Sequence, residues 1–326
     1  MKFKIATIGC GFIAHSSHGP AHKKYKTENS NITLAACCDT NIEEAKKFAH
    51  KFGYEKTYTD YIQMLNEVQP DVVCLFVPPH LTAQFSCTIL KLKYPLLIEK
   101  PPGVNRKEAE QIKVAAKENN TSFMVAFNRR FMPIMQNALA YVKESKIDIS
   151  VIDYQMVRNN RTDDDFSTTA IHGIDLVKFI ANAEYTNISY DIQKVPIKDK
   201  DATNIFMQSP MKNGIFAKLS FVNSAGTIIE RVTLHGKDHT IFVNLPIWNG
   251  YDAPGEIIHI KNGSIVEIIA GEESDMYISN GFYNENKTFF DSLRNNKPLE
   301  PNIDSCLQPI DIEHTISKMI KEKFSH

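Results

Sequence analysis

Two glycines follow the first apolar run of the chain at the spacing of a dinucleotide-binding turn. Residues 4–8 read KIATI, and Gly9, Gly11, Phe12, Ile13 and Ala14 come after them. In such a turn the first glycine permits a tight bend, the second lets the backbone approach a pyrophosphate, and a small third residue lets the helix pack closely on the strand. The phosphate lies at the electropositive start of that helix. We expect these five residues to bind a cofactor; a merely tight strand-to-helix turn is the alternative.

Asp39 is the second candidate in this nucleotide site. It ends the next apolar run, residues 32–38, where a carboxylate can accept hydrogen bonds from an adenosine ribose. It comes later than the usual spacing of about 20 residues, which we attribute to a polar insertion at residues 15–31. A carboxylate would repel the 2′-phosphate of NADP, so Asp39 favours NAD, and NADP stays open. A helix cap before Glu43 is a role that Asp39 could serve as well.

A charged pair stands at the end of another apolar run. Residues 95–99 (PLLIE) predict a strand, and Glu99 and Lys100 lie at its carboxyl end, ahead of Pro101 and Pro102. In open α/β sheets ligands bind beyond the carboxyl ends of the strands. A cis bond between Lys100 and Pro101 would aim the lysine inward. The alternative for Glu99 and Lys100 is an ordinary surface pair.

Three polar residues share one face of a predicted helix at about residues 168–181. Thr168, His172 and Asp175 occupy positions i, i+4 and i+7 of a segment otherwise rich in apolar residues. Such a stripe can face a cleft and bind a substrate. Its alternative is a solvated helix face.

The last strand of the predicted first domain ends in amide and guanidinium groups. Asn128 and Arg129 stand where they could reach a substrate, whereas Arg130 is as well suited to an ion pair between domains. Further candidates for a sugar pocket, which the sequence does not separate from ordinary sheet residues, are Tyr154, Arg158, Trp248 and Tyr283.

In order and spacing, these motifs resemble those of the glucose-fructose oxidoreductase/inositol dehydrogenase/rhizopine-catabolism (Gfo/Idh/MocA) family. The resemblance rests on the glycine turn, on residues 99–101 (EKP), on residues 126–131 (AFNRRF) and on residues 172–175 (HGID). It covers nearly the whole chain. It implies a Rossmann domain, then a substrate domain whose open sheet commonly mediates oligomerisation. It also implies oxidation or reduction of a sugar or polyol carbon, with Lys100 contacting both the nicotinamide ribose and the substrate.

Two positions depart from the family pattern. Many relatives carry an acid where this chain has Thr168, which can bind a substrate hydroxyl but cannot hold a charge. Residues 79–83 (PHLTA) replace a common Pro-Asn-x-x-His pattern near the cofactor. We expect Pro78 and His80 to lie at the cofactor, where His80 would either contact the nicotinamide ribose or cap a helix.

Oxidation of a secondary alcohol needs a base with a pKa near neutrality close to the reacting carbon. Histidine meets this condition unperturbed, whereas lysine needs burial or a nearby positive charge to lower its pKa. We therefore expect His172 to be the main acid/base and Lys100 to orient and polarise the oxygen. The reverse assignment stays open. Either assignment requires the side chains of His172 and Lys100 to meet over the cofactor.

The elements that carry these residues divide the sequence into two parts. Residues 1–123 alternate apolar strands with helices, which predicts an NAD(P)-binding Rossmann domain with a doubly wound parallel sheet. Residues 124–326 hold runs of strands with few helices, which predicts an α+β domain with a large, mostly antiparallel open sheet for substrate binding and oligomerisation. The C-terminal helix could pack back on the first domain. We expect strands at 4–8, 32–38, 71–77, 95–99, 122–127, 148–158, 214–223, 228–236 and 239–245, and helices at 43–51, 61–68, 81–93, 105–119, 168–181, 281–294 and 306–323.

Composition excludes several classes of protein. A chain of 326 residues with a formal charge of −1 shows no footprint for nucleic acid. No stretch reaches the roughly 20 apolar residues of a membrane span, and the start leaves no room for a signal peptide, so we expect a cytoplasmic protein. We expect its six cysteines to be buried and reduced, and we expect no metal site. The expected partners are a small carbohydrate-like substrate and further copies of the chain, as a dimer or tetramer.

Two other functions stay open beside an oxidoreductase. One is a lyase or glycoside hydrolase that keeps NAD tightly bound and uses transient oxidation. The other is a non-catalytic ligand sensor, against which the presence of both Lys100 and His172 argues.

Overall fold

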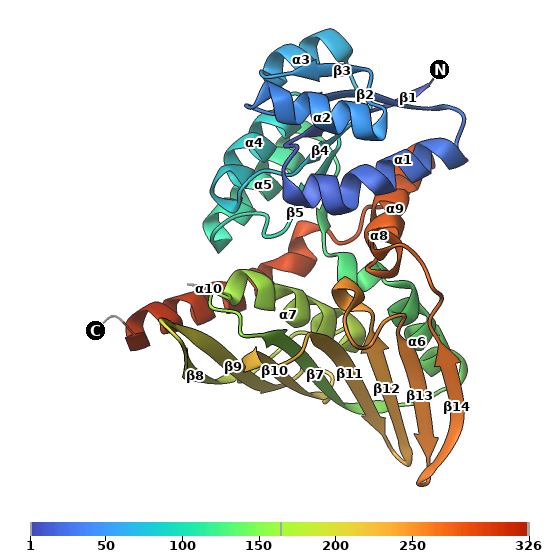
Figure 1. The fold of residues 1–326 in the computed structure, drawn as a ribbon, viewed down its shortest axis with the longest axis vertical. Helices are drawn as coiled ribbons and strands as arrows, with labels where there is room; N and C mark the ends of the chain where they lie inside the picture. The colour runs from blue at the N-terminus through green and yellow to red at the C-terminus, as the bar shows by residue number, and fades with distance from the viewer. Residues whose placement is uncertain (1, 164, 325–326) are drawn as a thin grey trace. The chain divides into compact units, whose positions relative to one another are not determined.

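The structure, a computed structural model, describes residues 2–163 and 165–324. Its internal contacts divide the chain into two compact units, each drawn in Figure 1. The first unit comprises residues 2–127 and Phe282–Asp311, and the second comprises Asn128–Gly281 and residues 312–324. In both described ranges, every helix is too short or too polar to cross a bilayer.

The first unit is built on a six-stranded parallel sheet in the order β3-β2-β1-β4-β5-β6. Its strands are β1 (Phe3–Ile8), β2 (Ile32–Cys38), β3 (Lys56–Tyr58), β4 (Val72–Leu75), β5 (Leu96–Glu99) and β6 (Phe123–Ala126). β2 and β4 are buried at every position, as a sheet covered on both faces requires. The strand order reverses between β1 and β4, the point at which doubly wound sheets bind dinucleotides. The predicted Rossmann fold is confirmed.

Several helices of the first unit begin at a residue whose side chain caps the helix N-terminus. These helices are α1 (Gly19–Glu28), α2 (Ile42–Phe52), α3 (Tyr61–Val68), α4 (Pro79–Lys91), α5 (Arg106–Asn119) and α9 (Phe282–Arg294). Asn105 caps α5, as predicted, by accepting a hydrogen bond from the backbone of Glu108 at 3.0 Å. Asn41, and not Asp39, caps α2. The helix-cap role considered for Asp39 is therefore wrong.

Residues 15–31 are mostly helical, not a polar insertion in the sense of a solvated loop. A turn of π-helix, η1 (Ala14–His18), runs directly into α1. This long first helix accounts for the distance between the glycine turn and Asp39. Its polar residues suggest exposure, but Ser17, His18 and His22 are completely buried. Single π-turns are frequent at functional sites, so the neighbourhood of His18 is a candidate one.

The second unit contains an eight-stranded sheet in the order β14-β13-β12-β11-β7-β10-β9-β8, in which only β7 and β10 pair in parallel. The predicted mostly antiparallel sheet is confirmed. Its strands are β7 (Ile149–Asn159), β8 (Ser189–Ile197), β9 (Lys200–Pro210), β10 (Phe216–Ala225), β11 (Ile229–Gly236), β12 (His239–Leu245), β13 (Glu256–Lys261) and β14 (Ser264–Ala270).

Helices cover one face of this sheet (Figure 1). They are α6 (Pro133–Glu144), α7 (Ser167–Ala181) and the end of α10 (Ile303–Phe324), whose Ile312, Ile316 and Ile320 join the core. Three short helices, η2 (Asn128–Phe131), η3 (Ile247–Asn249) and α8 (Met276–Ser279), lie in connections of this unit. Among the described residues of the unit, none forms a layer on the opposite face, and Phe242 and Ile268 are exposed.

Candidate active site

The glycine turn of the first unit is tightly packed at Gly9 and open at Gly11. Gly9 has a φ of +90°, and a Cβ atom there would lie 2.2 Å from the carbonyl oxygen of Phe76. A Cβ atom on Gly11 would meet no atom within 4 Å, so the backbone there is open to a ligand. Ala14 is completely buried, whereas the side chain of Phe12 is 79% exposed. Gly9 thus shapes the turn, and Gly11 leaves its surface accessible.

Asp39, which directly follows β2, accepts a hydrogen bond from the backbone of this turn. One carboxylate oxygen accepts a hydrogen bond from the backbone N–H of Cys10 at 2.8 Å. The other accepts one from the backbone N–H of Asn41 at 2.9 Å. The carboxylate therefore lies beside the glycine turn, as the sequence predicted. Each oxygen keeps a lone pair that a ribose hydroxyl could use.

The candidate residues after β4 lie at the start of α4, and those after β5 lie next to a cis peptide bond. Pro78 precedes α4 as its N-cap residue and is exposed, as is His80 in the first turn. His80 is not the cap of α4, so that alternative is wrong. The peptide bond between Lys100 and Pro101 is cis.

Glu99 has well-defined partners within the first unit. Its Oε1 lies 2.8 Å from Nε2 of the buried His18, and its Oε2 accepts the backbone N–H of Lys100 at 3.0 Å. Glu99 is thus not an ordinary surface residue. Sequence reasoning missed His18, although His15, His18 and His22 stand at i, i+3 and i+7 and mark one face of a helix.

His172 lies on α7 in the second unit, with 8% of its surface exposed. α7 approaches the sheet closely at the next residue, because a Cβ atom on Gly173 would lie 2.2 Å from the Tyr154 ring. Thr168, one turn earlier, is half-buried. Lys100 belongs to the first unit and His172 to the second, and their meeting stays a prediction.

The third member of the predicted stripe, Asp175, is completely buried and forms an ion pair with Arg130. Its two oxygens accept hydrogen bonds from Nε and Nη2 of Arg130 at 2.7 and 2.5 Å. Burial raises the pKa of Asp175, and the guanidinium opposes that rise. Arg130 therefore forms its ion pair inside the second unit. Contact of Asp175 with a substrate stays a prediction.

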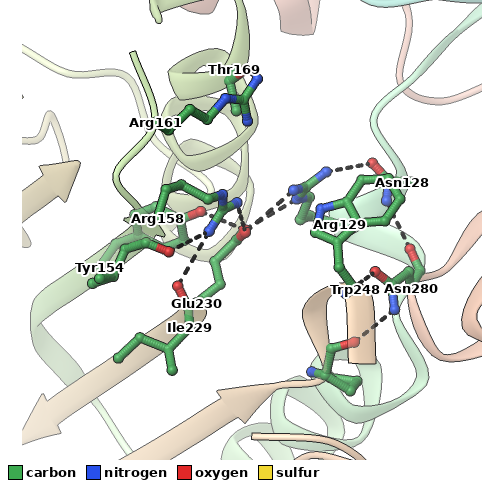
Figure 2. A network of polar contacts seen from close by, with 12 residues as sticks. Asn128, Arg129, Tyr154, Arg158, Arg161, Thr169, Ile229, Glu230, Trp248 and Asn280 are labelled. Carbon is green, nitrogen blue, oxygen red and sulfur yellow. Dashed lines mark hydrogen bonds and ion pairs between the residues drawn. The ribbon is translucent and has the colours of Figure 1, made fainter. Parts of the chain in front are cut away.

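Arg129 joins a second buried cluster, which Figure 2 shows from close by. Arg129 from η2 and Arg158 from β7 reach the carboxylate of Glu230, on β11, from opposite sides at 3.1 and 2.8 Å. Tyr154 donates to the same carboxylate at 2.5 Å. Burial alone would raise the pKa of Glu230, but the two guanidiniums and the hydrogen bonds from Arg129 and Tyr154 lower it to about 2.

Asn128 connects this cluster to the turn around η3. Its side-chain oxygen accepts from Arg129 at 3.1 Å, and its Nδ2 donates to the backbone oxygen of Asn280 at 2.8 Å. Asn280 in turn accepts the backbone N–H of Trp248, a residue with a φ of +51°. Asn128 and Arg129 are thus brought together, in a rigid polar cluster of the second unit.

Comparison with known proteins gives the family context. Residues 3–127 match the model of an oxidoreductase family with an NAD-binding Rossmann fold. The chain is 32% identical over 127 residues to oxidoreductase P35 of Formosa agariphila, an alignment of 39% of this chain and 38% of that protein. It is 27% identical over 128 residues to D-glucoside 3-dehydrogenase of Escherichia coli, over 39% of this chain and 35% of that enzyme.

Likeness in structure extends over the whole chain. A levoglucosan dehydrogenase solved in complex with NADH superposes with a TM-score of 0.81 at 17% identity, over 99% of this chain and 98% of that one. At this identity the likeness shows the fold alone. The alignments span less than two-fifths of the length of oxidoreductase P35 and of D-glucoside 3-dehydrogenase.

Proposed function

We propose that the chain is an NAD(P)-dependent oxidoreductase acting on a carbohydrate-like substrate, because residues 3–127 match the Gfo/Idh/MocA oxidoreductase family and because the relatives that the chain resembles include sugar dehydrogenases. It would transfer a hydride between the nicotinamide and a secondary hydroxyl or carbonyl group of a sugar, polyol or sugar derivative. Two named relatives, a D-glucoside 3-dehydrogenase and a levoglucosan dehydrogenase, support this substrate class. The observation that carries the proposal is the open backbone at Gly11 beside the carboxylate of Asp39.

The residues at the glycine turn fit a dinucleotide. Gly11 would lie against the pyrophosphate, and Phe12, Ile13 and Ala14 would begin the helix whose N–H groups face it. Asp39 would accept the ribose hydroxyls, and its charge favours NAD over NADP. Pro78, His80, Glu99 and Lys100 are the further residues that we assign to the cofactor.

Two side chains are proposed for the proton transfer and the orientation of the reacting oxygen. When bound, the oxidised cofactor accepts the hydride from the substrate carbon. His172 would take the hydroxyl proton as its C–O bond becomes a carbonyl. Lys100 would donate a hydrogen bond to that oxygen and stabilise the negative charge that develops on it. In the reductive direction the same proton returns from His172.

The substrate's remaining hydroxyls would be bound by the amide of Asn128 and by the hydroxyl of Thr168. Arg129 and Asp175 are the other two candidates for substrate contacts. Each already forms a buried ion pair, with Glu230 and Arg130 respectively. We therefore propose that these two side chains act mainly by holding their neighbours in place.

An activity assay tests the proposed function. Purified protein is mixed with NAD or NADP and a panel of sugars, inositols and sugar derivatives, and the reduced-nicotinamide absorbance is followed. We expect turnover with at least one substrate, and a loss of about 100-fold or more in kcat for Lys100→Ala and His172→Ala. Lys107→Ala, at an exposed position of α5, is the control and should keep full activity.

Full activity in Lys100→Ala would refute the proposed chemistry. A wild-type protein that forms product without net reduction of NAD would instead be a lyase or hydrolase that recycles its cofactor. Product analysis alongside the absorbance assay separates these two outcomes. A protein that binds sugar but converts none of the panel would indicate a ligand sensor.

A further inference from the structure

A chain of hydrogen bonds runs through the buried interior of the first unit and ends at Glu99. Its members, in order, are Thr7, Tyr54, His22, Asn286, His18 and Glu99. The five successive links measure 2.7, 2.6, 2.8, 2.9 and 2.8 Å between donor and acceptor atoms. These residues come from β1, the segment before β3, the first helix, α9 and β5.

The orientation of the Asn286 amide fixes the direction of this chain. Its Nδ2 lies 2.8 Å from the carbonyl oxygen of Phe282 and 2.9 Å from Nδ1 of His18. Its Oδ1 lies 2.8 Å from Nε2 of His22. A flipped amide would set its oxygen against the Phe282 carbonyl, where no hydrogen is available to either oxygen. The amide N–H groups must therefore face Phe282 and His18.

This orientation dictates the tautomer of both histidines. Nδ1 of His18 accepts the amide hydrogen, so Nε2 carries the ring hydrogen and donates it to Glu99. Nε2 of His22 donates to Asn286, so Nδ1 accepts the hydroxyl of Tyr54. Burial lowers the pKa of His22 to about 3, and that ring is neutral near pH 7.

Each hydrogen bond of the chain is therefore donated in the direction of Glu99, and the last one reaches its carboxylate. Its second oxygen accepts the backbone N–H of Lys100, at the start of the cis bond to Pro101. His18 is itself held in place because its ring stacks on Phe76 with 3.9 Å between the centroids. Glu99 is therefore fixed through both oxygens, by His18 on one side and by the backbone of Lys100 on the other.

We propose that Asn286 and His18 are positioning residues for Lys100, acting through Glu99. The inference rests on the proposed function, in which Lys100 contacts the reacting oxygen. A buried polar chain of this kind contributes little net stability compared with apolar residues of the same shape, but it defines one arrangement of its members. Here that arrangement ends at the residue preceding the proposed catalytic lysine. A rigid Glu99 keeps the backbone at Lys100 from shifting, and errors of about 1 Å in such placement cost on the order of 100-fold in rate.

NMR of protein labelled with ¹⁵N-histidine tests the direction of the chain without any turnover. We expect neutral rings protonated at Nε2 for both His18 and His22, assigned by comparison with His18→Gln and His22→Gln. Asn286→Asp cannot donate to His18, so there His18 should gain a second proton at Nδ1. A His18 ring protonated at Nδ1 alone in the wild type would overturn the proposed direction.

The effect on Lys100 is tested by ¹³C-dimethylation of the lysines, with the Lys100 resonance identified from Lys100→Arg. We expect His18→Leu to shift this resonance, because leucine cannot donate to Glu99. His18→Gln, whose amide N–H still reaches Glu99, should shift it less. His15→Gln is the matched control, since His15 lies in the same η1 turn but contacts Phe48 and Phe52. An unchanged Lys100 resonance in folded His18→Leu and Asn286→Asp would overturn the proposal.

Kinetics supply the second readout where the wild type turns over. We expect kcat to fall roughly 10- to 100-fold in His18→Leu, with KM for the cofactor within about twofold, and to recover in large part in His18→Gln. Loss of thermal stability with an unchanged kcat would mean a structural role only. An inert wild type would refute the proposed function, while the two NMR measurements would still decide the hydrogen-bond chain.

Discussion

At the scale of single residues, the second unit is organised around one buried carboxylate. Glu230 faces the guanidiniums of Arg129 and Arg158 and the hydroxyl of Tyr154, and it is completely buried. Removing its charge would leave two guanidiniums buried without a counter-charge. Breaking a buried pair in this way costs about 3–5 kcal/mol. The cluster therefore depends on Glu230 more than on either arginine.

We predict that Glu230→Gln lowers the free energy of unfolding by about 3–5 kcal/mol at pH 7. The folded pKa of Glu230 is about 2, below that of an unfolded glutamate near 4.3, so its contribution to stability is present above pH 4–5 and is lost as pH falls toward 2. Urea denaturation at several pH values measures both effects. Glu43→Gln, in an exposed pair with Lys46, is the control and should change nothing measurable.

The burial of His22 leads to a separate prediction about how the stability of the protein depends on pH. Its folded pKa of about 3 lies below the 6.5 of a free histidine, so the unfolded state binds a proton at higher pH than the folded state. Stability should therefore fall as pH decreases from about 6.5 toward 3, by at most about 1.4 kcal/mol per pH unit. His22→Gln should remove this slope between pH 6.5 and 5. An unchanged slope in that variant would show that His22 titrates normally.

Single residues differ in how far the sequence reveals them. The Asn105 cap and the position of Glu99 and Lys100 at a strand end follow from local patterns, and the structure confirms both. Glu230 does not, because it occupies an inward position of β11, where alternation predicts an apolar residue. Its partners Arg129 and Arg158 lie 101 and 72 residues away in sequence. No local pattern indicates pairs at that separation.

At the scale of elements, the two glycines of the turn between β1 and the first helix differ in what surrounds them. Gly9 is needed for folding, because its φ is positive and a Cβ atom would overlap the backbone of Phe76. Gly11 is not needed for folding, because a Cβ atom there meets no atom of the protein within 4 Å, and we expect it to be needed for cofactor binding. Substitution by alanine should therefore lower the stability at Gly9 and the cofactor affinity at Gly11.

We predict that Gly9→Ala is strongly destabilised, by at least about 2 kcal/mol. An alanine would have to adopt a strained positive φ, and the backbone of Phe76 would have to move to make room for its Cβ atom. Gly11→Ala should keep its thermal stability without cofactor but bind NADH at least about tenfold more weakly. Thermal unfolding and NADH fluorescence titration measure the two quantities. Equal NADH affinity in Gly11→Ala and wild type would show that the pyrophosphate does not approach this backbone.

The sequence predicts elements well where their pattern is regular. β2, α3 and β12 have the predicted bounds, because buried apolar runs and clear amphipathic spacing mark them. β8 and β9 were missed because Pro196 and the charged turn after it resemble a loop. β14 was missed because nearly all of its residues are exposed, so apolar and polar positions do not alternate.

At the scale of the whole molecule, some contacts depend on residues at opposite ends of the sequence. Phe282–Asp311 belongs to the first unit, where Asn286 bonds to His18 and Asp291 to Tyr25 across more than 260 residues. A helix pattern predicts α9 itself but does not indicate which surface it covers. The proposed route from Asn286 to Lys100 could be found only once these contacts were known.

A second feature of the whole molecule is the face of the eight-stranded sheet on which no described residue of the second unit forms a layer. Phe242 pairs with Ile258, and Ile258 with Ile268, so three apolar side chains lie side by side across β12, β13 and β14. Phe242 is 36% and Ile268 is 52% exposed. Contiguous apolar patches of this kind commonly mark protein interfaces. We expect this face to join two copies of the chain.

We predict that Ile268→Lys weakens self-association at least about 100-fold. In a two-fold symmetric interface each substitution occurs twice, so two ammonium groups would lose water without a counter-charge. Size-exclusion chromatography with light scattering measures the mass of each species over a range of concentrations. Val114→Lys, at an exposed position of α5 with 51% accessibility, adds the same charge on the first unit and should leave the mass unchanged. A monomeric wild type, or an Ile268→Lys variant that associates as strongly as the wild type, would contradict this prediction.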